Sequence, residues 1–207
     1  PRPRAFPLLI RSSLAFCALA VFLFAISGCR VFQSPAPCVC PEDAWLQIPP
    51  PATEREARIE QARARRGDHY ARRLAFFLDD TPARQPGGVV FIGDSITEGF
   101  PLAAAFPNQN VINRGISGDT IAGARERLDV SAALLHPREV YLLIGVNDIL
   151  SWREGSIARL AVQYERLAAE LKAAVPEARI TLLSVFPLSG PRAQYNPDVQ
   201  WLNRRIQ

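Results

Sequence analysis

The stretch that decides the fold is an apolar run followed by a polar turn, Val89-Val90-Phe91-Ile92-Gly93-Asp94-Ser95. Four apolar residues in succession predict a short strand that is covered on both faces, as strands of parallel sheets are. Comparable runs recur at 111–112, 140–144 and 180–186, with helical patterns between them. Alternating strands and helices predict an α/β domain built on a doubly wound parallel sheet.

Three helical patterns surround these strands. Thr53 and Glu56 are spaced as a capping box, which predicts a helix that runs to about Leu78. A helix over 154–174 and another over 198–207 are predicted from apolar residues that recur at helical spacing. In the first of these two the apolar face holds Ile157, Leu160, Ala161, Tyr164, Leu167, Ala168 and Leu171, and in the second it holds Val199, Leu202 and Ile206. We interpret these faces as core packing.

Polar residues follow each of the first three apolar runs. In parallel sheets ligands bind beyond the carboxyl ends of the strands, so Ser95, Gly118 and Asn147 fall where a site is expected. Each residue alone also has a plain structural interpretation. Ser95 could cap a helix. Gly118 could lie in a simple loop in which Asp119 or Thr120 caps the next helix, and Asn147 could be a turn residue.

Taken together, the three motifs resemble the GDSL, or SGNH, hydrolase family. The motifs are Gly93-Asp94-Ser95, the loop from Asn113 to Thr120, and Gly145-Val146-Asn147-Asp148, and the resemblance covers residues 67–207. It implies a flavodoxin-like three-layer sandwich. It also implies that Ser95 is the nucleophile and that Ser95 N–H, Gly118 N–H and the Asn147 side chain form an oxyanion hole. The pattern Asn-x-Gly-Ile-x-Gly-Asp-Thr with Ile-Gly-Val-Asn-Asp is similar to the platelet-activating-factor acetylhydrolase-like branch.

The resemblance implies a serine esterase that works through an acyl-enzyme and needs no metal or cofactor. Short acyl or O-acetyl esters, including lysophospholipid-like and acetylated glycan substrates, are the expected small ester partners. Donors aimed at the tetrahedral oxyanion lower the barrier to ester cleavage, which agrees with the residue types after the strands. We expect Asp94 and Asp148 to hold the loops by hydrogen bonds, outside the chemistry itself.

The general base that Ser95 needs is not evident in this sequence. The family's fourth block, Asp-x-x-His, does not occur, and the two histidines are His69 and His136. His136 precedes the third strand and should lie at the opposite edge of the sheet, whereas His69 is expected at the surface. We therefore expect a domain that is truncated at its C-terminus, with an incomplete sheet, and a fragment that is itself inactive.

Two other functions stay open on the sequence alone. One is a catalytically silent lipoprotein that binds a glycan or an acyl group in the same crevice. The other is acyl transfer to a sugar or alcohol, since this reaction would use the same acyl-enzyme.

The first residues predict export. Residues 1–13 are basic without acids, and residues 14–26 are 13 consecutive apolar residues, which is short of the roughly 20 that span a bilayer. Ile26-Ser27-Gly28-Cys29 is similar to a bacterial lipobox. We expect a signal peptide over 1–28, lipidation of Cys29, a proline-rich tether over 29–52 and the hydrolase domain over 53–207. The protein would be a lipoprotein anchored in a membrane on the periplasmic side of the bacterial envelope; an uncleaved membrane anchor is the alternative.

Charge argues against a nucleic-acid partner. The formal net charge is +4, but Arg2, Arg4 and Arg11 lie in the predicted signal peptide, and removing them leaves +1. The remaining arginines are interleaved with acids, as on an ordinary solvated surface. Cys38 and Cys40 have no histidine nearby, so no metal site is predicted.

Overall fold

A computed structural model describes residues 53–151 and 157–206 of the protein. All of them belong to one compact unit of the chain, Pro49–Gln207. The signal peptide, the Cys29 lipidation site and the tether predicted over 1–52 lie outside the described residues. Among the helices that are described, none combines the length and apolar character that a membrane crossing requires.

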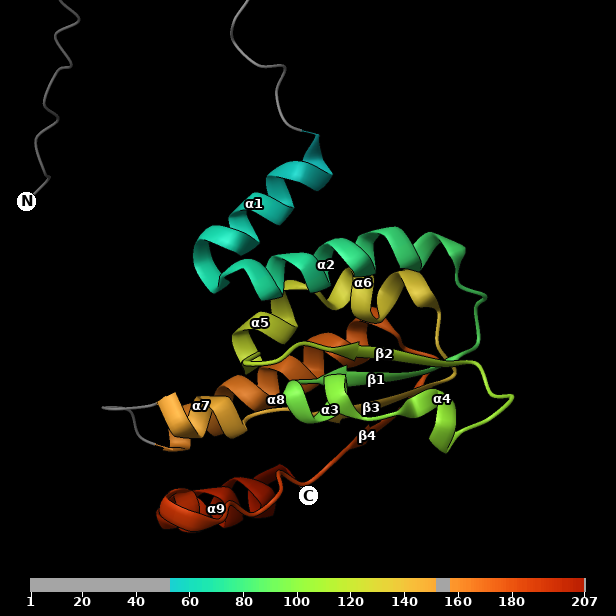
Figure 1. Ribbon diagram of the computed structural model, residues 1–207. Helices are drawn as coiled ribbons and strands as arrows, with labels where there is room; N and C mark the ends of the chain where they lie inside the picture. The colour runs from blue at the N-terminus through green and yellow to red at the C-terminus, as the bar shows by residue number, and fades with distance from the viewer. Residues whose placement is uncertain (1–52, 152–156, 207) are drawn as a thin grey trace, which may run out of the picture. The chain divides into compact units, whose positions relative to one another are not determined.

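The domain is built on a sheet of four parallel strands in the order β2-β1-β3-β4 (Figure 1). The strands are β1 (Val89–Gly93), β2 (Val111–Gly115), β3 (Glu139–Leu143) and β4 (Arg179–Leu182). Their register places Gly93 beside Gly115 on one side and Leu143 on the other. The parallel sheet flanked by helices confirms the predicted flavodoxin-like α/β fold.

Nine α-helices are described, most of them short. They are α1 (Glu54–Arg66), α2 (Asp68–Asp80), α3 (Ser95–Gly99), α4 (Leu102–Ala105), α5 (Ile121–Glu126), α6 (Leu128–Ser131), α7 (Val146–Ser151), α8 (Ile157–Ala174) and α9 (Asn196–Ile206). Three 3-10 turns cover Thr81–Ala83, Ala133–Leu135 and Gly190–Tyr195.

The N-terminal helical region differs from the prediction. The capping box is confirmed, because Glu56 N–H donates to Thr53 Oγ1 at 3.2 Å and Thr53 N–H donates to Glu56 Oε2 at 3.0 Å. The single helix predicted to reach Leu78 is wrong: Gly67, with φ of 88°, separates α1 from α2. Ala62 of α1 and Tyr70 of α2, on either side of the break, belong to one apolar cluster.

The fourth strand is also shorter than the predicted 180–186. After β4, Leu183 N–H still donates to the Leu142 carbonyl at 2.9 Å. Val185 instead pairs with a side chain of α9: its N–H donates to Asn203 Oδ1 at 2.8 Å, and its carbonyl accepts from Asn203 Nδ2 at 2.9 Å. A side-chain amide thus takes the place of a neighbouring strand.

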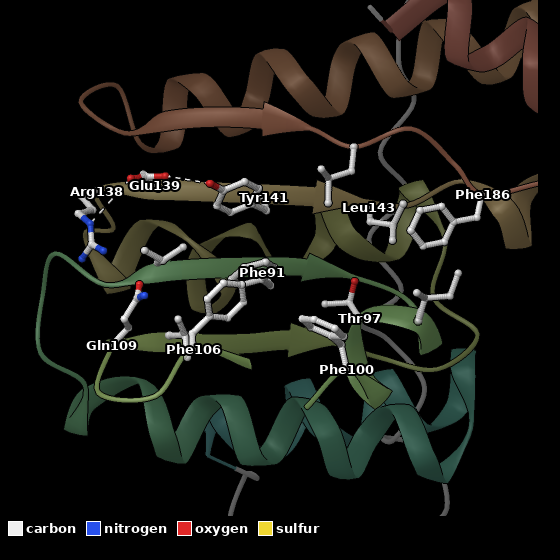
Figure 2. Close-up of a pocket in the computed structure, with 14 residues that line it drawn as sticks. Phe91, Thr97, Phe100, Phe106, Gln109, Arg138, Glu139, Tyr141, Leu143 and Phe186 are labelled. Carbon is white, nitrogen blue, oxygen red and sulfur yellow. Dashed lines mark hydrogen bonds and ion pairs between the residues drawn. The ribbon is translucent and has the colours of Figure 1, made fainter. Parts of the chain in front are cut away.

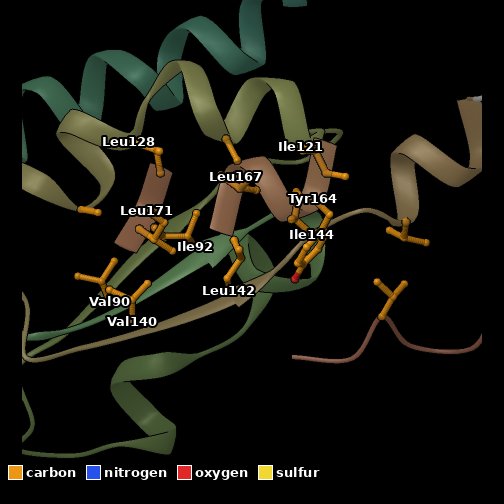
Figure 3. Close-up of a cluster of buried hydrophobic side chains, with 14 of the residues drawn as sticks. Val90, Ile92, Ile121, Leu128, Val140, Leu142, Ile144, Tyr164, Leu167 and Leu171 are labelled. Atoms are coloured by element: carbon orange, nitrogen blue, oxygen red, sulfur yellow. The ribbon is translucent and has the colours of Figure 1, made fainter. Parts of the chain in front are cut away.

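The main core lies between one face of the sheet and the helices α5, α6 and α8. Figure 3 shows Ile92 and Val140 of the sheet facing Leu167 and Leu171 of α8. The predicted apolar face of α8 is confirmed at the buried residues Leu160, Ala161, Tyr164, Leu167 and Leu171. The face predicted for the last helix is confirmed as well, with Val199 and Leu202 buried in α9.

The other face of the sheet carries a pocket of about 630 Å³ (Figure 2). Phe91 stacks on Tyr141 with ring centroids 4.9 Å apart, and on Phe106 at 5.7 Å. At the carboxyl end of the strands the pocket reaches Ile96 and Phe186. It therefore borders the start of α3, where Ser95 lies.

Candidate active site

The three predicted site residues lie at the same edge of the sheet. Ser95 begins α3 just after β1, Gly118 follows β2, and Asn147 lies in the first turn of α7 after β3. Because the three strands are adjacent, parallel and in register at Gly93, their carboxyl ends meet there. The structure thus brings together the three residues that the sequence motifs singled out.

The Ser95 turn is held by its neighbours. Gly93 is required because a Cβ there would collide with Thr97 Oγ1 and with the Leu143 carbonyl oxygen. Asp94 caps α3, since its Oδ1 accepts from Ile96 N–H at 3.0 Å. The interpretation of Ser95 as the helix cap is therefore wrong. Ser95 is exposed, and within the described residues neither its hydroxyl nor its N–H has a hydrogen-bond partner.

The Gly118 loop presents a second unpaired N–H. Gly118 has φ of +79°, a conformation that favours glycine, and the space around its Cα is open. In the described part of the chain its N–H donates to no protein acceptor. Thr120 caps α5 by accepting from Gly123 N–H at 3.2 Å. Asp119 is not the cap, and its buried carboxylate instead pairs with Arg127 at 2.7 Å.

Asn147 directs its amide toward the Gly118 loop. Its Nδ2 donates one hydrogen to the Asp119 carbonyl at 2.8 Å. An amide nitrogen carries two hydrogens, so the second stays available to a ligand. Together with the N–H groups of Ser95 and Gly118, this gives three donors at one edge of the sheet.

Asp94 and Asp148 hold the surrounding backbone, as predicted. Asp148 is 6% exposed, and its Oδ2 accepts from Ile121 N–H, the first residue of α5, at 3.1 Å. Burial raises the pKa of Asp148 to about 6, and the charges of Asp119 and Asp94 add to the shift. Burial also raises the pKa of Asp94. No group of three or more His, Cys, Asp or Glu side chains in the described ranges is arranged to hold a metal ion.

Neither histidine is hydrogen-bonded to Ser95 within residues 53–151 and 157–206. His136 lies before β3, at the amino edge as predicted, and its carbonyl accepts from Gly87 N–H at 2.8 Å. His69 Nε2 lies 3.0 Å from Glu98 Oε2. Glu98 also accepts from Ser117 Oγ at 2.7 Å, so this acid connects His69 to the residue that precedes Gly118.

Glu98 and Arg127 were not among the site residues predicted from the sequence. The spacing of Glu98, three residues after Ser95 in α3, could have suggested that it borders the site. Arg127 carried no such signal, because its partners Asp119 and Gly93 lie 8 and 34 residues away in the chain.

The family model for GDSL-like lipases and acylhydrolases matches residues 91–207. A GDSL-like lipase from Bacteroides thetaiotaomicron is 26% identical with a TM-score of 0.56, over 63% of this chain and 69% of that chain. A Streptococcus pneumoniae protein described as a platelet activating factor is 23% identical with a TM-score of 0.59, over 73% and 71%. An acylhydrolase from Bacteroides fragilis is 22% identical with a TM-score of 0.54, over 63% and 68%. These last two support the fold.

No curated protein matches the chain. The family match spans more than half of the sequence and includes Ser95, Gly118 and Asn147. The chain belongs to the GDSL-like lipase/acylhydrolase family.

Proposed function

We propose that the protein is a serine esterase in which Ser95 attacks the carbonyl carbon of an ester. One observation carries the proposal: the unpaired Ser95 hydroxyl shares an edge of the sheet with two unpaired backbone N–H groups and the Asn147 amide. A nucleophile beside unpaired hydrogen-bond donors is the arrangement that acyl transfer requires.

In the proposed reaction Ser95 Oγ bonds to the ester carbon as its proton passes to a general base, for which the described residues show no group hydrogen-bonded to Ser95. The carbonyl electron pair moves to the oxygen, which Ser95 N–H, Gly118 N–H and the Asn147 amide stabilise. Losing one such donor costs about 2.7–4 kcal/mol of transition-state stabilisation. The intermediate collapses to an acyl-enzyme as the base returns the proton to the departing alcohol. Water then attacks the acyl carbon, gives its proton to the same base and releases the acid, and the proton returns to Ser95 Oγ.

The proposed substrates are carboxylic esters with a short acyl or O-acetyl group, on a lysophospholipid-like or glycan alcohol. An apolar surface borders the nucleophile in support of an acyl part: Ile96, next to Ser95, and the nearby Phe100 and Phe186 line the pocket. All three side chains are exposed, at 39%, 44% and 53%. Large apolar side chains exposed together at a concave surface favour an apolar ligand group.

Hydrolysis of p-nitrophenyl acetate by the full-length protein tests the proposal. Ser95→Ala should lower kcat by about 10⁴-fold or more, because no other group replaces the nucleophile. Ser189→Ala is the matched control, since Ser189 is exposed and its side chain makes no capping hydrogen bond; it should leave kcat unchanged. Undiminished turnover in Ser95→Ala would refute the proposal. Binding of an ester without turnover by the wild type would favour the silent binding lipoprotein.

We also propose that the protein is exported and held on a membrane through lipid on Cys29. The support is the sequence pattern at 14–29. Anchoring of this kind takes more than one acyl chain. Mass analysis of the wild-type protein should find an N-terminal peptide that begins at Cys29 and carries lipid, and Cys29→Ser should carry none; a wild-type protein without lipid at Cys29 would contradict anchoring there.

A further inference from the structure

Arg127 is a buried cation that connects two loops of the site. Its side chain is 1% exposed, and the residue directly follows the last residue of α5. Nε and Nη2 donate to Asp119 Oδ2 at 2.9 and 2.7 Å, and Nη2 also donates to the Gly93 carbonyl at 3.2 Å. Nη1 donates to Ser131 Oγ at 2.7 Å. One guanidinium thus joins the end of β1 to the loop after β2.

Both contacts lie directly beside the proposed catalytic groups. The Gly93 carbonyl belongs to the peptide that leads into Asp94 and Ser95. Asp119 follows Gly118, and its own carbonyl accepts the hydrogen bond from Asn147 Nδ2. Movement of either Arg127 partner would therefore displace a donor or the nucleophile.

We propose that Arg127 is a positioning residue that fixes the Ser95 turn relative to the Gly118–Asp119 loop, so that the oxyanion donors converge. This proposal rests on the esterase function proposed above. Arginine suits the role because the planar fork of its guanidinium donates hydrogen bonds to two acceptors at once, whereas a lysine ammonium is a single point charge. A displacement of about 1 Å in an active site can cost about 10²-fold in rate.

The surroundings leave Arg127 and Asp119 little freedom. A Cβ on Gly123 would collide with Asp119 Oδ1, so α5 packs directly on the carboxylate. The Phe77 ring lies 5.6 Å from the Arg127 guanidinium carbon. Phe77 is fully buried, so the ion pair is enclosed on both sides.

Arg125, which lies in α5, provides a control. Its Nε and Nη2 donate to Glu170 Oε2 and Oε1 at 2.8 and 2.6 Å, so its guanidinium also makes a two-pronged ion pair. Glu170 lies in α8, so neither residue of this pair belongs to the three loops of the site.

The test compares Arg127→Lys with Arg125→Lys in the full-length protein, using p-nitrophenyl acetate. Arg127→Lys keeps the charge opposite Asp119 but cannot reproduce the fork, so kcat should fall about 10- to 100-fold while KM changes less than about threefold. Arg125→Lys should leave kcat within about twofold. Hydrogen exchange of the Asp119 amide, which donates to the Ile116 carbonyl at 3.0 Å, should accelerate in Arg127→Lys alone.

Wild-type kcat in Arg127→Lys, or an equal loss in Arg125→Lys, would overturn the proposal. If Arg127→Lys does not fold, Asp119→Asn removes the charge at nearly constant size and should lower kcat with KM unchanged; unchanged kcat there would equally overturn it. Failure of the esterase function is recognised separately, by turnover that persists in Ser95→Ala. In that event the Asp119 exchange rate still shows whether Arg127 holds the loop.

Discussion

At the scale of single residues, Asp148 links the site to the stability of the domain. Its pKa is about 6 in the folded protein against 3.8 as the reference value. The folded state therefore binds a proton at Asp148 more readily than the unfolded chain does. The stability that this protonation provides is complete below pH 3.8 and is lost as the pH rises through 6. At neutral pH the buried Asp148 carboxylate is ionised, and this lowers the free energy of unfolding.

Asp148→Asn should remove this pH dependence while keeping an oxygen for Ile121 N–H. Between pH 4.5 and 7.5, the wild type should lose about 2 kcal/mol of unfolding free energy more than the variant does. Urea unfolding of both proteins at the two pH values measures the difference. A difference between the two proteins that is the same at both pH values would show that Asp148 does not titrate in this range.

Residues of the site differ in how far their positions could be predicted. Ser95, Gly118 and Asn147 could be placed because each follows an apolar run, and the parallel topology fixes where strand ends meet. Local backbone angles make Asp94 and Thr120 the helix caps, and the residue types around them do not determine these angles. The Arg127–Asp119 pair joins residues eight apart on either side of α5, so the spacing of neighbours on one helix could not predict it.

At the scale of elements, Gly67 determines how the N-terminal region packs. Its φ of 88° and ψ of 173° lie in a region that is essentially restricted to glycine. The prediction of one helix to Leu78 began from the capping box at Thr53 and did not allow for a glycine with this backbone geometry. The sequence signal for the break was the glycine itself.

Gly67→Ala should reduce the unfolding free energy by about 1–3 kcal/mol. The cost is conformational, because a Cβ there would meet no heavy atom within 4 Å. Gly99→Ala is the control: its Cβ would also have open space and its φ lies outside the positive range, so it should be neutral or slightly stabilising. Urea unfolding of both variants checks this, and a stabilised Gly67→Ala would mean that the chain prefers one continuous helix.

At the scale of the whole domain, the two faces of the sheet differ. The apolar runs predicted strands that are covered on both faces. One face is indeed buried under α5, α6 and α8, at residues such as Val90 and Leu142. On the other face the described residues leave Phe91 and Tyr141 half-buried beside the pocket. A continuous apolar run indicates that both faces of a strand favour burial, but it does not indicate which elements cover each face.

The proposed esterase function depends on Ser95 as a nucleophile, and reaction of the full-length protein with a fluorophosphonate tests this most directly. The reagent bonds to an activated serine oxygen and releases fluoride, so intact-mass and peptide analysis locate the adduct. We predict one adduct, on the peptide that contains Ser95, with loss of ester hydrolysis in proportion to labelling and no adduct in Ser95→Ala. An adduct on another residue, or equal labelling of the Ser95→Ala variant, would contradict the account.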